Sequence, residues 1–322
     1  MKRTIRAIAV AMVLLFNMSP SALAARLLIP GGQLVGLELS NDAVTVAAFD
    51  DICGGAARAA GLQIGDQILS VNGRKVNGAE DVRQAVQNCT GEAELVVLRG
   101  SKQVTLRVKP AETKTGRRLG VYLRQGIAGV GTVTFYDPEK DAFGTLGHGV
   151  NDGKGALLPA TRGTICEAEV ASVRKGKPGD PGQLKGSAEG EAVLGQITKN
   201  TPQGVFGTCK GSIFGEPLPV AEFEDVKIGR ATIRSTVSGD KVQEYSVEIL
   251  KIYPRDRGDC RNFLIKVTDP ALLEATGGIV QGMSGSPIIQ DGKLVGAVTH
   301  VLVNDPTRGY GIFIENMLDA AG

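Results

Sequence analysis

Hydrophobic and polar residues alternate along much of the second half of the chain. Tyr245, Val247 and Ile249 fall on one side of an extended segment, and the polar residues between them fall on the other. Similar short runs, separated by turn-forming residues, occur at residues 131–136, 231–237 and 262–267. A period of two is typical of β-strands with one buried face. The pattern predicts a β domain at residues 119–322, built as two small antiparallel barrels or a sandwich, with one helix at 314–321.

The first part of the chain combines short strands with one amphipathic helix. Val82 and Val86 stand one turn apart in the helix expected at 79–88. Strands are expected at residues 36–39, 43–48, 67–71, 94–99 and 103–109. These elements predict a separate domain at residues 28–110. The polar segment 111–118 that follows lacks apolar periodicity and is predicted to be a solvated linker.

Residues 59–73 of this first domain resemble the PDZ domains of bacterial proteases. The resemblance implies that the loop binding a peptide's terminal carboxylate through backbone N–H groups consists of Leu34, Val35, Gly36 and Leu37. It also implies that Val82 and Val86 line the peptide groove. For each of these apolar residues, a place in the hydrophobic core is the alternative.

The amino terminus carries a targeting pattern. Lys2, Arg3 and Arg6 precede an apolar run at residues 7–16, and small residues follow it. This order is typical of an export signal, and the run is shorter than the roughly 20 residues that span a bilayer. We expect residues 1–25 to be a signal peptide, with a lasting membrane anchor as the alternative, and the protein to act beyond the cytoplasmic membrane.

Charge and cysteine content exclude other classes of protein. The 36 basic and 34 acidic residues nearly balance, so no nucleic-acid partner is expected. Five cysteines lie far apart without a C-x-x-C pair, so we expect no metal site and no cofactor. An odd number of cysteines leaves at least one thiol unpaired, and the pattern does not decide whether the others form disulfides.

One glycine-rich loop has the composition of a nucleophile loop. Ser284 lies between Gly282 and Gly285, where glycine permits backbone angles that expose a hydroxyl and aim N–H groups into one pocket. An ordinary hairpin loop is the alternative. Ser286 is the weaker candidate because Pro287 follows it.

The chain contains only two histidines, so a serine–histidine mechanism must use one of them. His148 lies in a glycine-flanked loop that leaves its ring free to approach a neighbouring barrel. His300 lies inside the apolar strand expected at 294–303, where alternation fixes its direction. We therefore predict His148 as the base, with a purely structural histidine as the alternative.

Together, these two loops resemble the histidine and nucleophile loops of chymotrypsin-like proteases. The chain as a whole resembles the SpoIVB peptidase family of endospore-forming bacteria, through residues 268–270, 276–287 and 296–301. This resemblance implies a mainly β protein in which an N-terminal PDZ domain precedes a chymotrypsin-like double β-barrel peptidase domain.

The family resemblance also implies the roles of individual residues. Ser284 would be the nucleophile, His148 the base, and Asp269 the acid that orients the imidazole. The N–H groups of Gly282 and Ser284 would form the oxyanion hole. Asp269 stands unusually close before the serine in sequence, so Asp137, also followed by proline, is the alternative orienting residue.

The biology implied by the resemblance is an exported serine endopeptidase of sporulation signalling. It would act between the forespore and mother-cell membranes, and cleave itself and a membrane-associated regulator of an intramembrane protease complex, so that a mother-cell sigma factor is processed. The PDZ domain would bind the substrate, another copy or the chain's own amino-terminal segment. The alternative is a non-catalytic PDZ adaptor with an inactive barrel. A zinc intramembrane protease is excluded because no H-E-x-x-H motif occurs.

Overall fold

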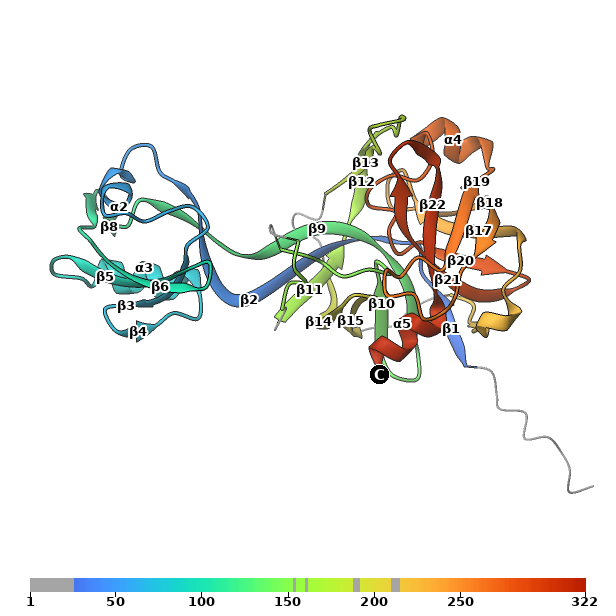
Figure 1. The fold of residues 1–322 in the computed structure, drawn as a ribbon, viewed down its shortest axis with the longest axis horizontal. Coiled ribbons are helices and arrows are strands. Elements are labelled where there is room, and N and C mark those ends of the chain that lie inside the picture. Colours follow the sequence, from blue (N-terminus) through green and yellow to red (C-terminus); the bar gives the residue numbers. More distant parts are fainter. Residues whose placement is uncertain (1–25, 153–154, 160–161, 188–191, 210–214) are drawn as a thin grey trace, which may run out of the picture.

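The computed structural model describes residues 26–322, except 153–154, 160–161, 188–191 and 210–214. These residues form two β-barrels and a smaller unit that stands apart at one end of the molecule (Figure 1). The predicted signal peptide lies outside the described residues. Within the described part, no helix is long and apolar enough to cross a membrane.

The first barrel consists of six antiparallel strands and closes because its first and last strands in spatial order pair with each other. Those strands, in that order, are β9 (Val121–Asp137), β10 (Ala142–Thr145), β15 (Gly204–Cys209), β14 (Val193–Thr201), β11 (Arg162–Glu167) and β2 (Leu34–Phe49). Beside it lie β1 (Leu27–Pro30) and β16 (Leu218–Pro219), and the ribbon of β12 (Glu169–Arg174) and β13 (Gln183–Ser187). Val133, Phe143 and Ile165 are buried in its core.

The second barrel is also closed and has six antiparallel strands. They are β17 (Gly229–Thr236), β18 (Val242–Ile252), β19 (Phe263–Val267), β22 (Asp305–Phe313), β21 (Lys293–Leu302) and β20 (Pro287–Gln290). The remaining elements are a short 3-10 turn (Phe223–Asp225), α4 (Pro270–Thr276) and α5 (Ile314–Ala321). The two barrels confirm the predicted double-barrel architecture, and α5 confirms the expected final helix.

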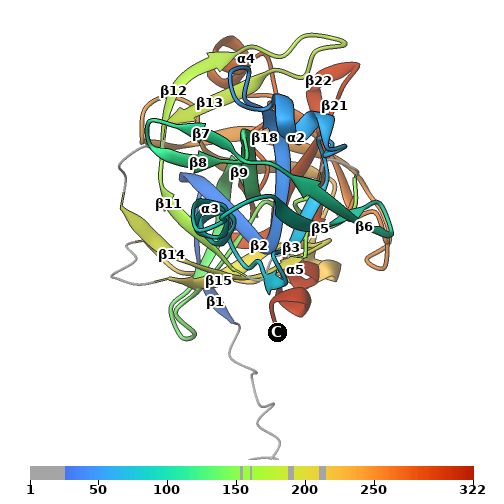
Figure 2. The same cartoon turned by 90° about the vertical axis from the view of Figure 1, so that its left-hand side faces the viewer.

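The unit at the end of the molecule is the PDZ domain. Its elements are α2 (Gly55–Ala59), β3 (Gln67–Val71), β4 (Arg74–Lys75), α3 (Ala79–Gln87), β5 (Ala93–Arg99), β6 (Lys102–Val108), β7 (Ala111–Thr113) and β8 (Gly116–Arg118). Figure 2 shows this domain from its free end, in front of the barrels. The buried Val82 and Val86 of α3 pack on its sheet.

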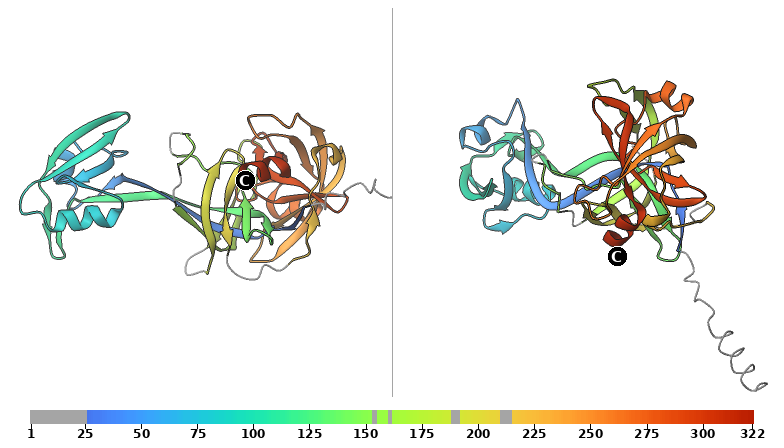
Figure 3. Two further views of the ribbon diagram at one scale, coloured as in Figure 1. Left: turned by 90° about the horizontal axis from the view of Figure 1, so that it is seen from below. Right: turned by 45° about the vertical axis from the view of Figure 1, so that its right-hand side comes forward.

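The PDZ domain and the first barrel share two long strands, β2 and β9. Residues 34–39 of β2 pair with residues 127–132 of β9 inside the barrel, whereas residues 44–49 pair with 121–125 inside the PDZ domain. The two long strands therefore leave the barrel together as one ribbon (Figure 3). This corrects the predicted boundary at residue 28.

The segment predicted to be a linker is a β-hairpin. Ala111 of β7 pairs with Arg118 of β8, and Gly116 has a φ of 107° that permits the tight turn between them. The hairpin packs against α3 of the PDZ domain. Its polar composition misled the prediction because a two-stranded ribbon on the surface buries few apolar side chains.

The core of the second barrel is organised around two aromatic rings. Phe263 is fully buried, and its ring meets that of Phe313 edge-on, with centroids 4.7 Å apart. Gly296 and Gly311 make room for the ring, because a Cβ at either position would lie within 2.8 Å of it. The strands can approach Phe263 closely only where these side chains are missing.

Replacing Phe263 by alanine is therefore expected to leave a cavity that the barrel cannot close. We expect Phe263→Ala to lower the free energy of unfolding by about 3–5 kcal/mol, measured by urea denaturation. Val303→Ala is the control, because Val303 is 51% exposed, and it should change the stability by about 0.5 kcal/mol or less. Equal effects of the two substitutions would contradict the packing argument.

Candidate active site and peptide groove

The nucleophile loop of the second barrel is fastened to β9 of the first. Thr132 N donates to Ser284 O at 3.0 Å, and Thr132 Oγ1 donates to Gly282 O at 2.8 Å. Thr134 Oγ1 donates to Gly285 O at 2.8 Å. A Cβ on Gly285 would lie 2.0 Å from the Thr132 oxygen, so only glycine fits this approach. These contacts hold Ser284 at the boundary between the barrels.

The backbone of this loop leaves two donors beside the serine. Gly282 has a φ of 100° and Gly285 one of 97°, both in the region that favours glycine. Met283 and Gly285 each donate to a backbone carbonyl. Among the described residues, no acceptor is present for the N–H groups of Gly282 and Ser284. Two free donors near a hydroxyl meet the requirement of an oxyanion hole, and this assignment stays a prediction.

Ser284 and His148 line the same cavity, of about 430 Å³. The cavity takes its walls from both barrels: residues of β2 and β9 on one side, and residues 279–282 and the end of β21 on the other. Most of these lining side chains are apolar. The structure thus brings together the two residues that the sequence singled out for catalysis, although they lie far apart along the chain.

The ring of His148 is held by a contact with the backbone of the next residue. Its Nδ1 lies 3.0 Å from the carbonyl oxygen of Gly149. When Nδ1 carries the proton and donates to this carbonyl, Nε2 is left as the acceptor that a general base needs. Burial lowers the pKa of His148 below its ordinary value of 6.5, which favours the neutral ring.

The hydroxyl of Ser284 is bonded to a different partner in this state. Its Oγ donates to the carbonyl oxygen of Thr299 at 2.7 Å. Attack on a substrate requires the hydroxyl to exchange this carbonyl for the imidazole nitrogen of His148. Catalytic hydrogen bonds often form only when substrate is bound, so this bond alone does not exclude Ser284 as a nucleophile.

A second histidine, His300, lies in the same cavity. Its ring centroid is 5.2 Å from that of His148. Burial, assisted by the nearby His148, lowers the pKa of His300 to about 4. Its Nδ1 is buried and has no partner among the described residues. The sequence analysis set His300 aside because it lies in a strand. The tight turn after Gln290 folds that strand back beside Ser284. This turn is the feature of the sequence that could have indicated that His300 lies near the serine.

Asp269 lies elsewhere and has another role. Its Oδ1 accepts from the N–H groups of Ala271 and Leu272 at 3.0 and 3.1 Å, and caps α4. Its Oδ2 accepts from Ser246 N at 3.2 Å. The proline that follows Asp269 begins the helix, which is why the carboxylate is drawn to the helix N-terminus. The prediction that Asp269 orients His148 is therefore wrong, because its carboxylate caps α4.

The alternative orienting residue, Asp137, is also engaged away from His148. Its carboxylate is buried, forms an ion pair with Arg26 at 2.6 Å, and accepts from the backbone of Glu139 and Lys140. Among the described residues, the only recorded partner of the His148 ring nitrogens is therefore a backbone carbonyl.

The alternative nucleophile, Ser286, is buried in the second barrel. Its hydroxyl donates to Ser235 Oγ at 3.1 Å. A hydroxyl enclosed in this way has no access to a substrate. Ser286 remains the weaker candidate, as the following proline suggested.

The predicted carboxylate-binding loop is part of a barrel strand. Residues 34–37 belong to β2 and pair with β9, and residues 35–37 also pair with β11 on the other side. Leu34 and Leu37 are buried. A segment with both edges paired cannot accept a peptide, so this prediction is wrong.

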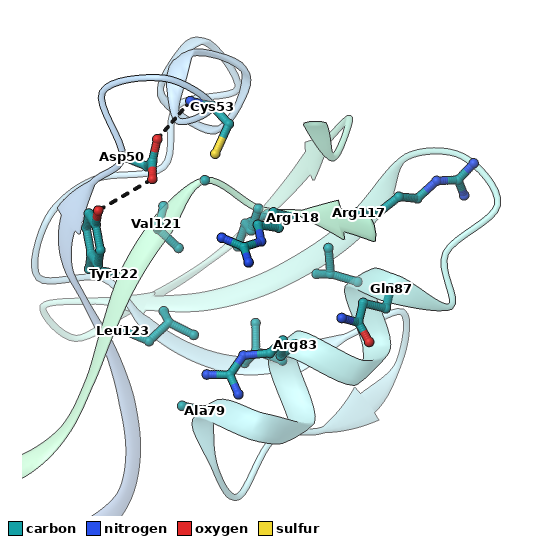
Figure 4. A pocket seen from close by; sticks show the side chains of 14 residues that line it. Asp50, Cys53, Ala79, Arg83, Gln87, Arg117, Arg118, Val121, Tyr122 and Leu123 are labelled. Carbon is teal, nitrogen blue, oxygen red and sulfur yellow. Dashed lines mark hydrogen bonds between the residues drawn. The ribbon is translucent and has the colours of Figure 1, made fainter. Parts of the chain in front are cut away.

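The PDZ groove lies instead between α3 and the start of β9 (Figure 4). Its volume is about 530 Å³, and Val82 and Val86 do line it. The loop at its end is formed by Leu119 and Gly120, directly before β9. The sequence analysis missed this loop because it assigned residues 111–118 to a linker and everything after them to the peptidase domain.

The five cysteines, all within the described residues, are unpaired. Cys89, Cys209 and Cys260 are buried, and Cys53 and Cys166 are partly exposed. No disulfide constrains either barrel or the PDZ domain in this structure. The fold is therefore held by its hydrophobic cores and sheet hydrogen bonds.

Two closed barrels with a serine and a histidine in the cavity between them define a serine peptidase, here with a PDZ domain. The chain belongs to the SpoIVB peptidase S55 family, whose sequence model matches residues 115–318. A PDZ domain model matches residues 52–100. Strand β2, which precedes both matches, completes the first barrel.

Some solved structures are partly similar to this chain. An inactive form of the protease Rv3671c from M. tuberculosis is 17% identical, with a TM-score of 0.35, over 60% of this chain and 84% of that one. The HtrA-type protease AlgW with a decapeptide is 12% identical, with a TM-score of 0.38, over 66% of this chain and 59% of that one. No curated protein matches the chain.

The capping role of Asp269 predicts a mild effect of its amide substitution. Asparagine caps helices about as well as aspartate, so Asp269→Asn should keep turnover within about threefold of the unmodified protein. An acid that orients the histidine would lose about 10⁴-fold. The measurement is the rate of hydrolysis of a quenched fluorescent peptide, with His148→Ala as the inactive reference. A loss near that of the reference would restore the orienting role.

The buried histidines predict where activity declines with acid. A general base must be neutral, and burial lowers the pKa of His148 below 6.5. Protonation therefore begins at lower pH than for an exposed histidine, and the acid limb of kcat/KM should have its midpoint below pH 6.5. The profile is measured with a peptide substrate in buffers of constant ionic strength. A midpoint at or above 6.5 would be inconsistent with a buried base.

Proposed function

We propose that the protein is a serine endopeptidase in which Ser284 attacks the peptide bond and His148 acts as general base. The observation that carries this proposal is the shared cavity between the barrels, which holds the hydroxyl, the imidazole and two unbonded N–H groups. The predicted acids are engaged elsewhere: Asp269 caps α4, and Asp137 pairs with Arg26.

The chemistry follows from the positions of these groups. His148 Nε2 takes the proton of Ser284 as Oγ adds to the scissile carbonyl carbon, and the carbonyl oxygen becomes an oxyanion bound by the N–H groups of Gly282 and Ser284. The protonated imidazole then gives its proton to the leaving amine. Water repeats the sequence on the acyl-enzyme and restores the serine.

The carbonyl of Gly149 would serve where many serine peptidases use a carboxylate. It would hold the Nδ1 proton and so leave Nε2 unprotonated, as the acceptor for the serine proton. A neutral carbonyl stabilises the imidazolium less than a charged carboxylate does. We therefore infer a serine–histidine dyad with slower turnover than a full triad.

The biological setting is proposed from the family. The protein is exported through its amino-terminal segment and acts in the space between forespore and mother-cell membranes. There it cleaves itself and a membrane-associated regulator of an intramembrane protease complex, and so triggers the processing of a mother-cell sigma factor. The PDZ domain supports this proposal because a regulatory peptidase needs a second site that selects partner chains.

The second candidate is a non-catalytic PDZ adaptor. The bond from Ser284 Oγ to the Thr299 carbonyl is the observation that favours it, because a hydroxyl held by a carbonyl is not poised for attack. The two candidates differ in one property that can be measured directly, the hydrolysis of a peptide bond.

The test is the loss of activity in Ser284→Ala. We expect turnover to fall by a factor on the order of 10⁴ to 10⁶. The chain's own cleavage products should also disappear from a mass-spectrometric map. Ser286→Ala is the matched control, since its hydroxyl bonds only within the barrel, and it should remain active. If Ser284→Ala and the unmodified chain gave the same products at the same rate, the adaptor would be the better description.

A further inference from the structure

The ribbon of β12 and β13 lies against the segment that leads to the nucleophile loop. Gln281 N donates to Gly182 O at 3.3 Å, and Leu184 N donates to Gln281 O at 2.8 Å. These bonds form a parallel bridge between Gln183 and Gln281. The ribbon therefore holds the residue directly before Gly282, whose N–H group is one of the two donors predicted for the oxyanion.

One of these bonds fixes the direction of that donor. The carbonyl of Gln281 and the N–H of Gly282 belong to the same peptide unit, which is planar and trans, so the two groups point in opposite directions. Because the carbonyl points at Leu184, the N–H points away from the ribbon. Gln281 and Gly282 line the cavity that holds Ser284, whereas no residue of β12 or β13 lines it. The bond from Leu184 therefore leaves the donor on the cavity side.

This peptide unit depends on the ribbon more than its neighbour does. The next unit along the chain is held by Thr132, whose Oγ1 donates to Gly282 O at 2.8 Å. For the carbonyl of Gln281, Leu184 N is the only donor recorded among the described residues. Gly282 has a φ of 100° and no side chain to limit rotation of the unit before it. A rotated unit would present a carbonyl oxygen to the oxyanion and repel it.

The ribbon is anchored on both sides of the catalytic cavity. At its tip, Gly176 N donates to the carbonyl oxygen of Thr276 in α4 at 2.7 Å. Near its base, a Cβ on Gly186 would lie 2.8 Å from the side chain of Val130 in β9. Leu184 itself is fully buried. The ribbon is thus a fixed support against which the peptide unit can be oriented.

We propose that Leu184 is a positioning residue of the active site. Its N–H group holds the peptide unit between Gln281 and Gly282 in the orientation that presents the Gly282 N–H to the oxyanion. This role rests on the proposed peptidase function and places control of the oxyanion hole in the β12–β13 ribbon, outside the cavity. A change in the position of the ribbon would alter turnover without any contact to Ser284 or His148.

The first test compares proline with alanine at position 184. Both substitutions remove the leucine side chain, but only Leu184→Pro removes the N–H group. Loss of one oxyanion donor lowers kcat by about 10²–10³, so Leu184→Pro should lower kcat by about 10- to 100-fold relative to Leu184→Ala. The KM should stay within about threefold, because the donor acts on the transition state. Hydrolysis of a quenched fluorescent peptide is measured for equal amounts of folded protein, determined by circular dichroism.

The matched control is the same pair of substitutions at Val170. Val170 N donates to Gly239 O at 2.7 Å, so proline there removes a bond of the same ribbon that does not reach Gln281. The kcat values of Val170→Pro and Val170→Ala should agree within about threefold. Equal kcat values for the two Leu184 variants would overturn the positioning role and leave the peptidase function intact.

A second measurement needs neither a substitution nor activity. Hydrogen exchange of single amides is followed by two-dimensional NMR on the unmodified full chain. The Leu184 amide should be protected because it donates within the fold, and the Gly282 amide, which has no acceptor among the described residues, should exchange at least about tenfold faster. Equal protection of the two amides, or protection of Gly282 alone, would overturn the proposed orientation. A chain that shows the expected exchange but cleaves no peptide would contradict the peptidase function instead.

Discussion

Strands β2 and β9 pair with each other in the barrel and again in the PDZ domain, and both sites of the protein are built on this ribbon. Its barrel half carries Leu37 of β2 and Ile127 of β9 into the wall of the catalytic cavity. Its PDZ half supplies residues 121–123 to the edge of the peptide groove. The register of this pairing shifts between Leu39 and Val44, where the ribbon passes from the barrel to the PDZ domain. The position of the groove relative to the cavity therefore depends on the two strands that join the domains.

The cavity that holds Ser284 and His148 lies where the loop around Ser284 is fastened to the first barrel. Thr132 and Thr134 of β9 bond three backbone positions around Ser284, which belongs to the other barrel. Hydrogen bonds from a strand to a loop fix the loop's direction more firmly than side-chain packing does, since each bond depends on angle as well as distance. These bonds hold the serine at the boundary between the two barrels.

Burial lowers the pKa values of the two histidines in the cavity. An apolar lining makes a charged ring costly, which keeps His148 and His300 neutral at ordinary pH. The same burial leaves Nδ1 of His300 without a partner. A buried polar atom without a hydrogen bond lowers the stability of the fold by about 1–3 kcal/mol, and other contacts in the barrel must offset this cost.

The amino-acid sequence by itself determined the features that depend on local geometry. Glycines on either side of Ser284 require a tight turn, period-two alternation requires strands, and Val82 and Val86 require an amphipathic helix. Tertiary structure alone decided which segments became partners. Residues 34–37 were predicted to be a loop, yet they lie in a strand in which residues 35–37 are paired on both edges. Asp269 was predicted to orient the histidine, yet its carboxylate caps helix α4. Hydrogen bonds between distant segments produce no periodic pattern in the sequence of either segment, so they can be identified only in the folded structure.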